Sequence, residues 1–288
     1  MISQTAPAGE PHFVLTMADH TEMCGQMARA FGNDSFAPPA PFDEVVYIVE
    51  NHDRGWDSYD SNPGLDPTTR VPYIMARTPT PDAVKTNRGS PDFNEAHHPY
   101  CGLLSSMHSW GLYNGRYGFS KFVPRTQTTT SISVADVHRP LIDAMLAYEE
   151  ARQARLKAAL AADPATHDWV EERHLFQNYK QLQFFDTMSL YFHLRHAGAR
   201  GAETYVHVPL NAEADTDITL KKIDERVYSL DPFPFAGDRL TIICRGRYVM
   251  PFPPDFPADR VGAALRELPA DRQAYELVPP PSQHRALL

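Results

Sequence analysis

The sequence has few cysteines and no long apolar run. Its three cysteines, Cys24, Cys101 and Cys244, are widely spaced and form no CxxC pair, so neither a disulfide framework nor a zinc knuckle is indicated. No stretch approaches the ~20 apolar residues that a membrane-spanning helix needs. The opening residues, MISQTAPAGEPHF, also lack the charged start and apolar run of a signal peptide. We therefore expect a cytoplasmic protein with no membrane partner.

Basic charge is also scarce. The 288 residues include 27 Lys and Arg against 36 Asp and Glu, a formal net charge of −9. This balance argues against a nucleic-acid partner, which requires a basic face to neutralise phosphates. It does not exclude a small anionic substrate, because a metal ion or a few local cations can override the overall charge. We expect a small-molecule substrate, and a homodimer is compatible with the sequence.

Apolar spacing predicts a mainly α fold. A helix is expected from near Ala18 to Gly32, where glycine is a stop signal. The segment Phe42–Glu50 is interpreted as a helix, although VVYIV also suits a buried strand. Three more helices are expected over Tyr100–Tyr113, Val134–Leu160 and Trp169–His196. Residues 55–98 are rich in Pro, Asn, Asp, Thr and Gly, which predicts a long ordered loop with short helices.

The pattern changes after residue 201. The segments ETYVHVPL, DITLKKI, RVYSL and RLTIICRGRYVM are short, β-branched and often alternating, which predicts a small C-terminal antiparallel β appendage. One short helix and a frayed proline-rich end complete the chain. We expect two domains, a helical domain over residues 12–200 and a β-rich segment over residues 201–288 packed on it.

Five acidic or imidazole side chains lie within or at the edge of apolar helical segments: His20, His52, Asp53, His108 and Asp186. The adjacent His52 and Asp53 end an apolar run, and an imidazole and a carboxylate there could hold one cation. An HD dipeptide is weak evidence alone, and a satisfied core histidine is the commoner role for His108. Asp186 interrupts LQFFDTMSLYF, where an unpaired buried carboxylate would cost several kcal/mol. A cation, a structural arginine or capping donors could satisfy it.

These residues and their surroundings resemble a known family. The segments ENHDRGWDSYD and FDTMSLYFHL carry HDxGW and D-x-[LM]-S-L motifs, and the order His20, His52-Asp53, His108, Asp186 resembles the HD-domain superfamily. The chain is similar over about residues 12–277 to a bacterial HD-like family of unknown function. The resemblance implies an HD-domain-like helical bundle that binds one or two divalent transition metals (Fe, Mn, Ni, Co or Zn). Its implied ligands are His20, His52, Asp53 and Asp186, with His108 for a second metal and His97 or His98 as an extra ligand.

The implied activity is a metal-dependent hydrolase that acts on a small phosphoester or related polar metabolite. Asp53 would be both a ligand and the catalytic base that orients water. The candidate substrate contacts, which include two side chains on the face of Asp186, are Arg54, Trp56, Asp57, Lys180, Gln183 and His193. Two alternatives stay open: an HD-type non-haem di-iron oxygenase, and a non-catalytic binding module that a metal stabilises.

Overall fold

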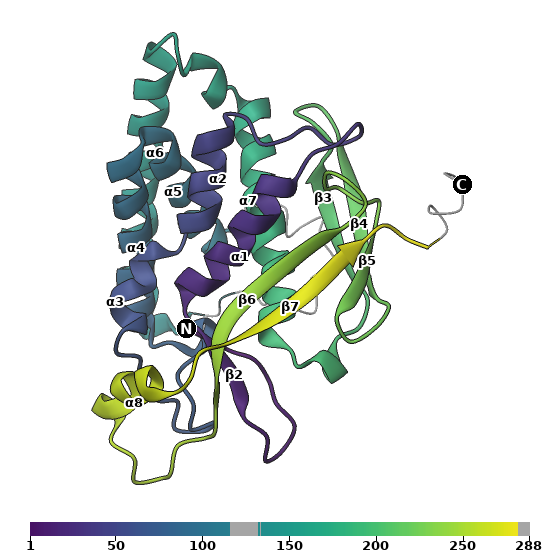
Figure 1. Ribbon diagram of the computed structural model, residues 1–288. Coiled ribbons are helices and arrows are strands. Elements are labelled where there is room, and N and C mark those ends of the chain that lie inside the picture. The colour runs from purple at the N-terminus through teal and green to yellow at the C-terminus, as the bar shows by residue number, and fades with distance from the viewer. Residues whose placement is uncertain (116–131, 133, 282–288) are drawn as a thin grey trace.

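The computed structural model describes residues 1–115, 132 and 134–281, and it has an α/β fold with helices against one side of a curled sheet (Figure 1). Of its residues, 51% are helical and 18% are in strands. The helices are α1 (Met17–Ala30), α2 (Phe42–Asn51), α3 (Asp57–Asp60), α4 (Thr80–His97), α5 (Pro99–Tyr113), α6 (Arg139–Ala162), α7 (Glu172–Leu194) and α8 (Val261–Glu267). No helix among the described residues is long and apolar enough to cross a membrane. The cytoplasmic location stays a prediction.

The sheet has seven strands in the order β1-β2-β6-β7-β5-β4-β3. All neighbouring strands are antiparallel except β5 and β7, which are parallel. The strands are β1 (Ile2–Ser3), β2 (His12–Leu15), β3 (Glu203–Pro209), β4 (Asp215–Lys222), β5 (Val227–Asp231), β6 (Leu240–Val249) and β7 (Asp271–Val278).

The predicted fold class, mainly α with a small C-terminal antiparallel appendage, is therefore wrong. The expected HD-domain-like bundle is replaced by helices packed on a large mixed sheet. The error has a physical cause: β1 and β2 have only two and four residues, and β2 pairs with β6 more than 220 positions later, so local patterning carries little signal. Strand β7 lies in the tail where only a helix and a frayed end were expected. Residues 282–288 of that end lie outside the described residues.

The sheet contains strands from both sides of the predicted boundary at residue 200. Strands β1 and β2 come from the start of the chain and extend the sheet formed by β3 to β7. The division into residues 12–200 and 201–288 stays a prediction.

Five of the predicted helical segments are confirmed, and one predicted loop is wrong. Helices α1, α2, α5, α6 and α7 cover the expected segments, whereas α4 occupies the second half of the loop predicted over residues 55–98. Its sequence, TPDAVKTNRGSPDFNEAH, contains a glycine and an internal proline that masked the helix. Gly55 explains how α4 approaches the HDRGW turn: a Cβ there would lie 2.1 Å from the carbonyl oxygen of Thr86.

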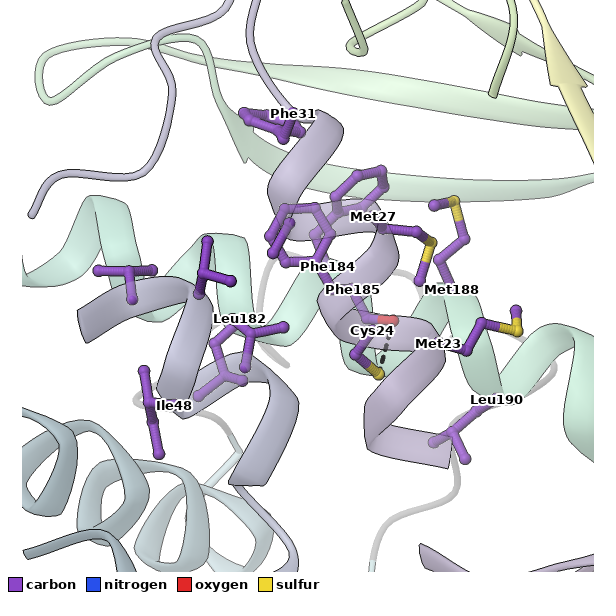
Figure 2. Close-up of a cluster of buried hydrophobic side chains, with 14 of the residues drawn as sticks. Met23, Cys24, Met27, Phe31, Ile48, Leu182, Phe184, Phe185, Met188 and Leu190 are labelled. Atoms are coloured by element: carbon purple, nitrogen blue, oxygen red, sulfur yellow. Dashed lines mark hydrogen bonds between the residues drawn. The ribbon is translucent and has the colours of Figure 1, made fainter. Parts of the chain in front are cut away.

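Helices α1 and α7 pack through large apolar side chains (Figure 2). Met23 and Met27 of α1, and Phe31 directly after it, belong to the same buried cluster as Phe185 and Met188 of α7. The Phe31 and Phe185 rings meet edge-on at 5.4 Å. Burial of each such side chain stabilises the fold by ~1.5–3 kcal/mol. This contact fixes the two helices that carry the predicted residues His20 and Asp186.

Candidate metal centre

The five side chains singled out in the sequence lie together in the interior. They come from α1, the end of α2, α5 and α7, and each is at most 7% exposed. Their ligand atoms form two overlapping groups, His20–His52–Asp186 and His52–Asp53–His108, with all atoms of a group within 4.8 Å of one another. The structure therefore brings together residues that are up to 166 positions apart in the sequence.

Each imidazole faces a carboxylate through its Nε2 atom. The closest pair is His20 Nε2 and Asp186 Oδ1, at 3.2 Å. His52 Nε2 lies 3.6 Å from Asp53 Oδ2 and 4.0 Å from Asp186 Oδ1, and His108 Nε2 lies 4.0 Å from Asp53 Oδ1. The Nε2 atoms of His20 and His52 are buried with no hydrogen-bond partner among the described residues.

The backbone fixes the tautomer of His52. Its Nδ1 lies 2.9 Å from the carbonyl oxygen of Val49, three residues earlier in α2. A carbonyl oxygen can only accept, so Nδ1 carries the proton and donates it. In the neutral imidazole, Nε2 then has a lone pair directed at the carboxylates of Asp53 and Asp186.

Ser189 fixes the tautomer of His20 in the same sense. The Ser189 hydroxyl donates to the carbonyl oxygen of Asp186 at 2.8 Å and lies 2.8 Å from His20 Nδ1. A hydroxyl that donates to the Asp186 carbonyl oxygen can only accept from His20, so in this arrangement His20 Nδ1 carries the proton. The lone pair of His20 Nε2 is therefore directed at Asp186.

This arrangement fits a divalent metal ion. Two lone pairs and two carboxylates face one another, and a cation between acceptors of this kind converts their repulsion into attraction. Two atoms that each lie ~2.1 Å from one ion at a tetrahedral angle are ~3.4 Å apart, which is close to the observed separations of 3.2–4.0 Å. Imidazole nitrogen with carboxylate oxygen suits Zn, Fe, Mn, Co or Ni.

His108 contacts a second side chain from α7. Its Nδ1 lies 3.0 Å from Gln183 Nε2, and Gln183 Oε1 is buried without a hydrogen-bond partner among the described residues. With the amide rotated by 180°, its oxygen would accept from His108 Nδ1–H, and the lone pair of His108 would then lie on Nε2, on the side of Asp53. Gln183, predicted as a substrate contact, thus positions His108.

His193 and Cys24 surround His20. His193 Nδ1 lies 3.2 Å from His20 Nδ1. Burial, together with the nearby His20 and Arg200, lowers the pKa of His193 well below its usual value, so this ring is neutral at pH 7. The Cys24 thiol donates to the carbonyl oxygen of His20, and burial beside Asp186 raises its pKa. Both groups therefore line the centre as neutral neighbours.

The remaining predicted residues take different positions. Arg54 pairs with Asp57 at 2.9 Å and lies over the Phe93 ring. Trp56 is buried and packs edge-on against Tyr59. Lys180 pairs with Asp215 of β4 at 2.5 Å, which directs it to the sheet.

The two histidines expected as extra ligands lie elsewhere. His97 stacks on Tyr47 with ring centroids 3.5 Å apart, and His98 caps α5 by accepting from the backbone N–H of Tyr100. Among the described residues, neither belongs to a group with metal-binding spacing. A third such group, His167, Asp168 and Glu171, lies on the surface.

Sequence reasoning missed two groups that orient the candidate ligands. Ser189 lies three positions after Asp186, on the same helix face, and a small polar residue within an apolar helix was the available signal. The Val49 carbonyl gave no signal, because every residue carries one. Together they fix the tautomers of His20 and His52.

Residues 1–250 match the model of a family described as a protein of unknown function (DUF3891), and the chain belongs to this family. No HD-domain family matches, so the assignment to the HD-domain superfamily is wrong. A shared order of His and Asp residues does not define a fold, and the helices that carry these residues belong to an α/β fold with a seven-stranded sheet. Searches of curated proteins and of solved structures give no match.

Proposed function

We propose that the protein is a metal-dependent hydrolase that acts on a small phosphoester or a related polar metabolite. The observation that carries the proposal is the pair of lone-pair Nε2 atoms, on His20 and His52, directed at buried carboxylates. His20, His52, Asp53 and Asp186 would hold one divalent ion. Because His52 Nδ1 donates to the Val49 carbonyl oxygen, only Nε2 is available to bind a metal. Both groups share this nitrogen, so we assign one ion to it.

Asp53 is the residue best placed for proton transfer. It is the most exposed of the five, at 7%, and its two oxygens face different imidazoles, those of His52 and His108. A bound ion would lower the pKa of a water molecule and neutralise charge on a phosphoryl oxygen. Asp53 would orient a water molecule and accept its proton as the water oxygen bonds to phosphorus. The ester oxygen would leave with that proton from Asp53, which restores the carboxylate.

Arg54 is the best candidate for binding the substrate phosphate. It directly follows Asp53, and its Nε is buried without a hydrogen-bond acceptor among the described residues. Arginine suits this role because its fork of N–H donors matches phosphate oxygens. Asp57 pairs with Nη2 of the guanidinium at 2.9 Å, whereas Lys180 is engaged by Asp215.

Hydrolysis of p-nitrophenyl phosphate and bis-p-nitrophenyl phosphate, with Mn²⁺, Zn²⁺ or Co²⁺ supplied, tests the proposal. We expect turnover that His52→Ala abolishes and that Arg54→Gln reduces mainly through a higher KM. His167→Ala, in the surface group, is the matched control and should leave turnover unchanged. Turnover that persists in His52→Ala would refute the proposal.

The two alternatives give different results in the same samples. A di-iron oxygenase would consume oxygen with two irons per chain and would not hydrolyse either ester. Its extra nitrogen ligand was expected at His97 or His98, and both lie away from the centre. A binding module would hold metal and show neither activity.

A further inference from the structure

A cavity of about 370 Å³ lies apart from the five residues of the candidate metal centre. The β1–β2 loop, the segment after α7, the β4–β5 turn and strands β6 and β7 enclose it. Its polar lining includes Arg200, Arg226, Tyr248 and Gln273. None of the five residues lines it, so any ligand that it holds is separate from the metal.

Arg200 is the buried cation of this cavity, with 6% of its surface exposed. Its guanidinium donates to the carbonyl oxygens of Phe192 (2.7 Å) and Arg195 (3.0 Å) at the end of α7. It also donates to the hydroxyls of Tyr228 and Tyr275, each at 3.0 Å. All four acceptors are uncharged, and among the described residues no carboxylate lies within the 4.0 Å of an ion pair with Arg200.

The helix end accounts for only part of this arrangement. The C-terminus of a helix carries roughly half a negative charge, so the carbonyl contacts leave the guanidinium incompletely neutralised. A buried charge is costly unless an opposite charge accompanies it. The four bonds use Nε–H, both hydrogens of Nη2 and one of Nη1, which leaves one Nη1–H for a ligand.

Further donors surround the opening of the cavity. Gln273 donates to the Tyr248 hydroxyl at 3.2 Å, so that hydroxyl keeps its own proton for a ligand. Arg226 is exposed and has no carboxylate partner among the described residues. Glu10 and Glu225 also line the cavity, but both are exposed, where water screens their charge.

We propose that this cavity binds a small oxyanion, either a carboxylate or a phosphate. The anion accepts from Arg200 Nη1–H in the interior, and Tyr248 and Arg226 contact it at the opening. The ligand supplies the negative charge that none of the described residues places beside Arg200. The site is independent of the function proposed for the metal centre.

Calorimetric titration of the full chain with inorganic phosphate, and separately with succinate, tests this site and identifies the anion class. We expect saturable binding of one of the two, weakened about tenfold or more by Arg200→Lys, as for the loss of a charge-assisted hydrogen bond. Arg226→Gln should weaken it less. The Arg226→Gln variant also keeps the test valid if Arg200→Lys fails to fold. Arg260→Gln, an exposed charge outside the cavity, should have no effect.

Three results would overturn the proposal. Neither anion binds the wild-type chain; or binding is unchanged in both Arg200→Lys and Arg226→Gln; or binding is lost in His52→Ala alone, which would place the anion on the metal. Binding that His52→Ala leaves intact supports the cavity even if hydrolysis is not found.

Discussion

Two buried charged clusters lie on the helical side of the molecule, and they are neutralised differently. In the first, Arg152 of α6 pairs with Glu149 (3.1 Å) and Glu95 (2.8 Å), and also with Asp92. In the second, the candidate metal centre, the ion-pair partners of Asp53 are imidazoles. The acids of the first cluster face the permanent cation of Arg152, whereas among the described residues Asp53 faces the imidazole nitrogens of His52 and His108.

This difference indicates what each cluster requires. The fully buried Glu149 pairs with Arg152 at 3.1 Å, although burial raises its pKa, so the chain itself supplies the opposite charge in the Arg152 cluster. The tautomers of His20 and His52 direct lone pairs at carboxylates, an arrangement that a metal ion stabilises. Removing a residue should therefore affect stability in the first cluster and metal binding in the second.

The largest expected effect is the loss of metal in His52→Ala and Asp186→Asn. Each substitution removes a proposed direct ligand, so the affinity should fall by more than the about 10–100-fold that is typical of outer ligand-orienting residues. Elemental analysis after dialysis measures the metal per chain. Asp168→Asn, in the exposed group with His167, should retain full metal content, and retention of metal in Asp186→Asn would contradict the assignment.

The next largest effect should come from Arg152→Met, which removes the chain's own cation. Leaving Glu149 buried without it should lower the free energy of unfolding by about 3–5 kcal/mol, measured by denaturant titration. Metal content should stay that of the wild type. The double variant with Glu149→Leu should recover part of the lost stability, because the unpaired acid is then gone. An Arg152→Met protein that loses metal but keeps its free energy of unfolding would contradict this comparison of the two clusters.

Withdrawal of metal should destabilise the wild type more moderately. An ion that binds only the folded chain, present at 100 times its Kd, adds about 2.7 kcal/mol, so a chelator should lower the melting temperature. The same chelator should leave Asp186→Asn unchanged. Equal shifts in the two proteins would show that the chelator acts elsewhere.

Ser189→Ala should give the smallest effect. Without the hydroxyl, His20 loses the acceptor that fixes its tautomer, and the metal affinity should fall about tenfold. Thr187→Ala on the same helix is the control, since its hydroxyl bonds to the Gln183 carbonyl oxygen. Competition with a chromophoric chelator measures both. Equal affinity in Ser189→Ala and the wild type would remove Ser189 from the centre.

The sequence was most informative where a polar side chain interrupts or ends an apolar segment. Asp186 within LQFFDTMSLYF and His52-Asp53 after VVYIVEN are polar groups in apolar segments, and burial makes such groups conspicuous. Those residues, with His20 and His108, do converge in the structure. Helical periodicity also located α1, α5 and α7, because each repeats its apolar residues over at least three turns.

Long-range pairing could not be obtained from the sequence. Strand β2 pairs with β6 and β7 lies between β5 and β6, and no local pattern encodes those partners. The same limit hid Arg200, whose burial depends on Tyr228 and Tyr275 from separate strands. Without this long-range information, the order of the His and Asp residues suggested an HD-domain-like bundle, a fold that the chain does not have.

Anomalous X-ray diffraction from crystals loaded with Zn²⁺ or Mn²⁺ tests the central claim most directly. The account predicts a peak within ~2.0–2.3 Å of His20 Nε2 and His52 Nε2, between the carboxylates of Asp53 and Asp186. A peak only at His167 and Asp168, or no peak with the ion in excess, would contradict it.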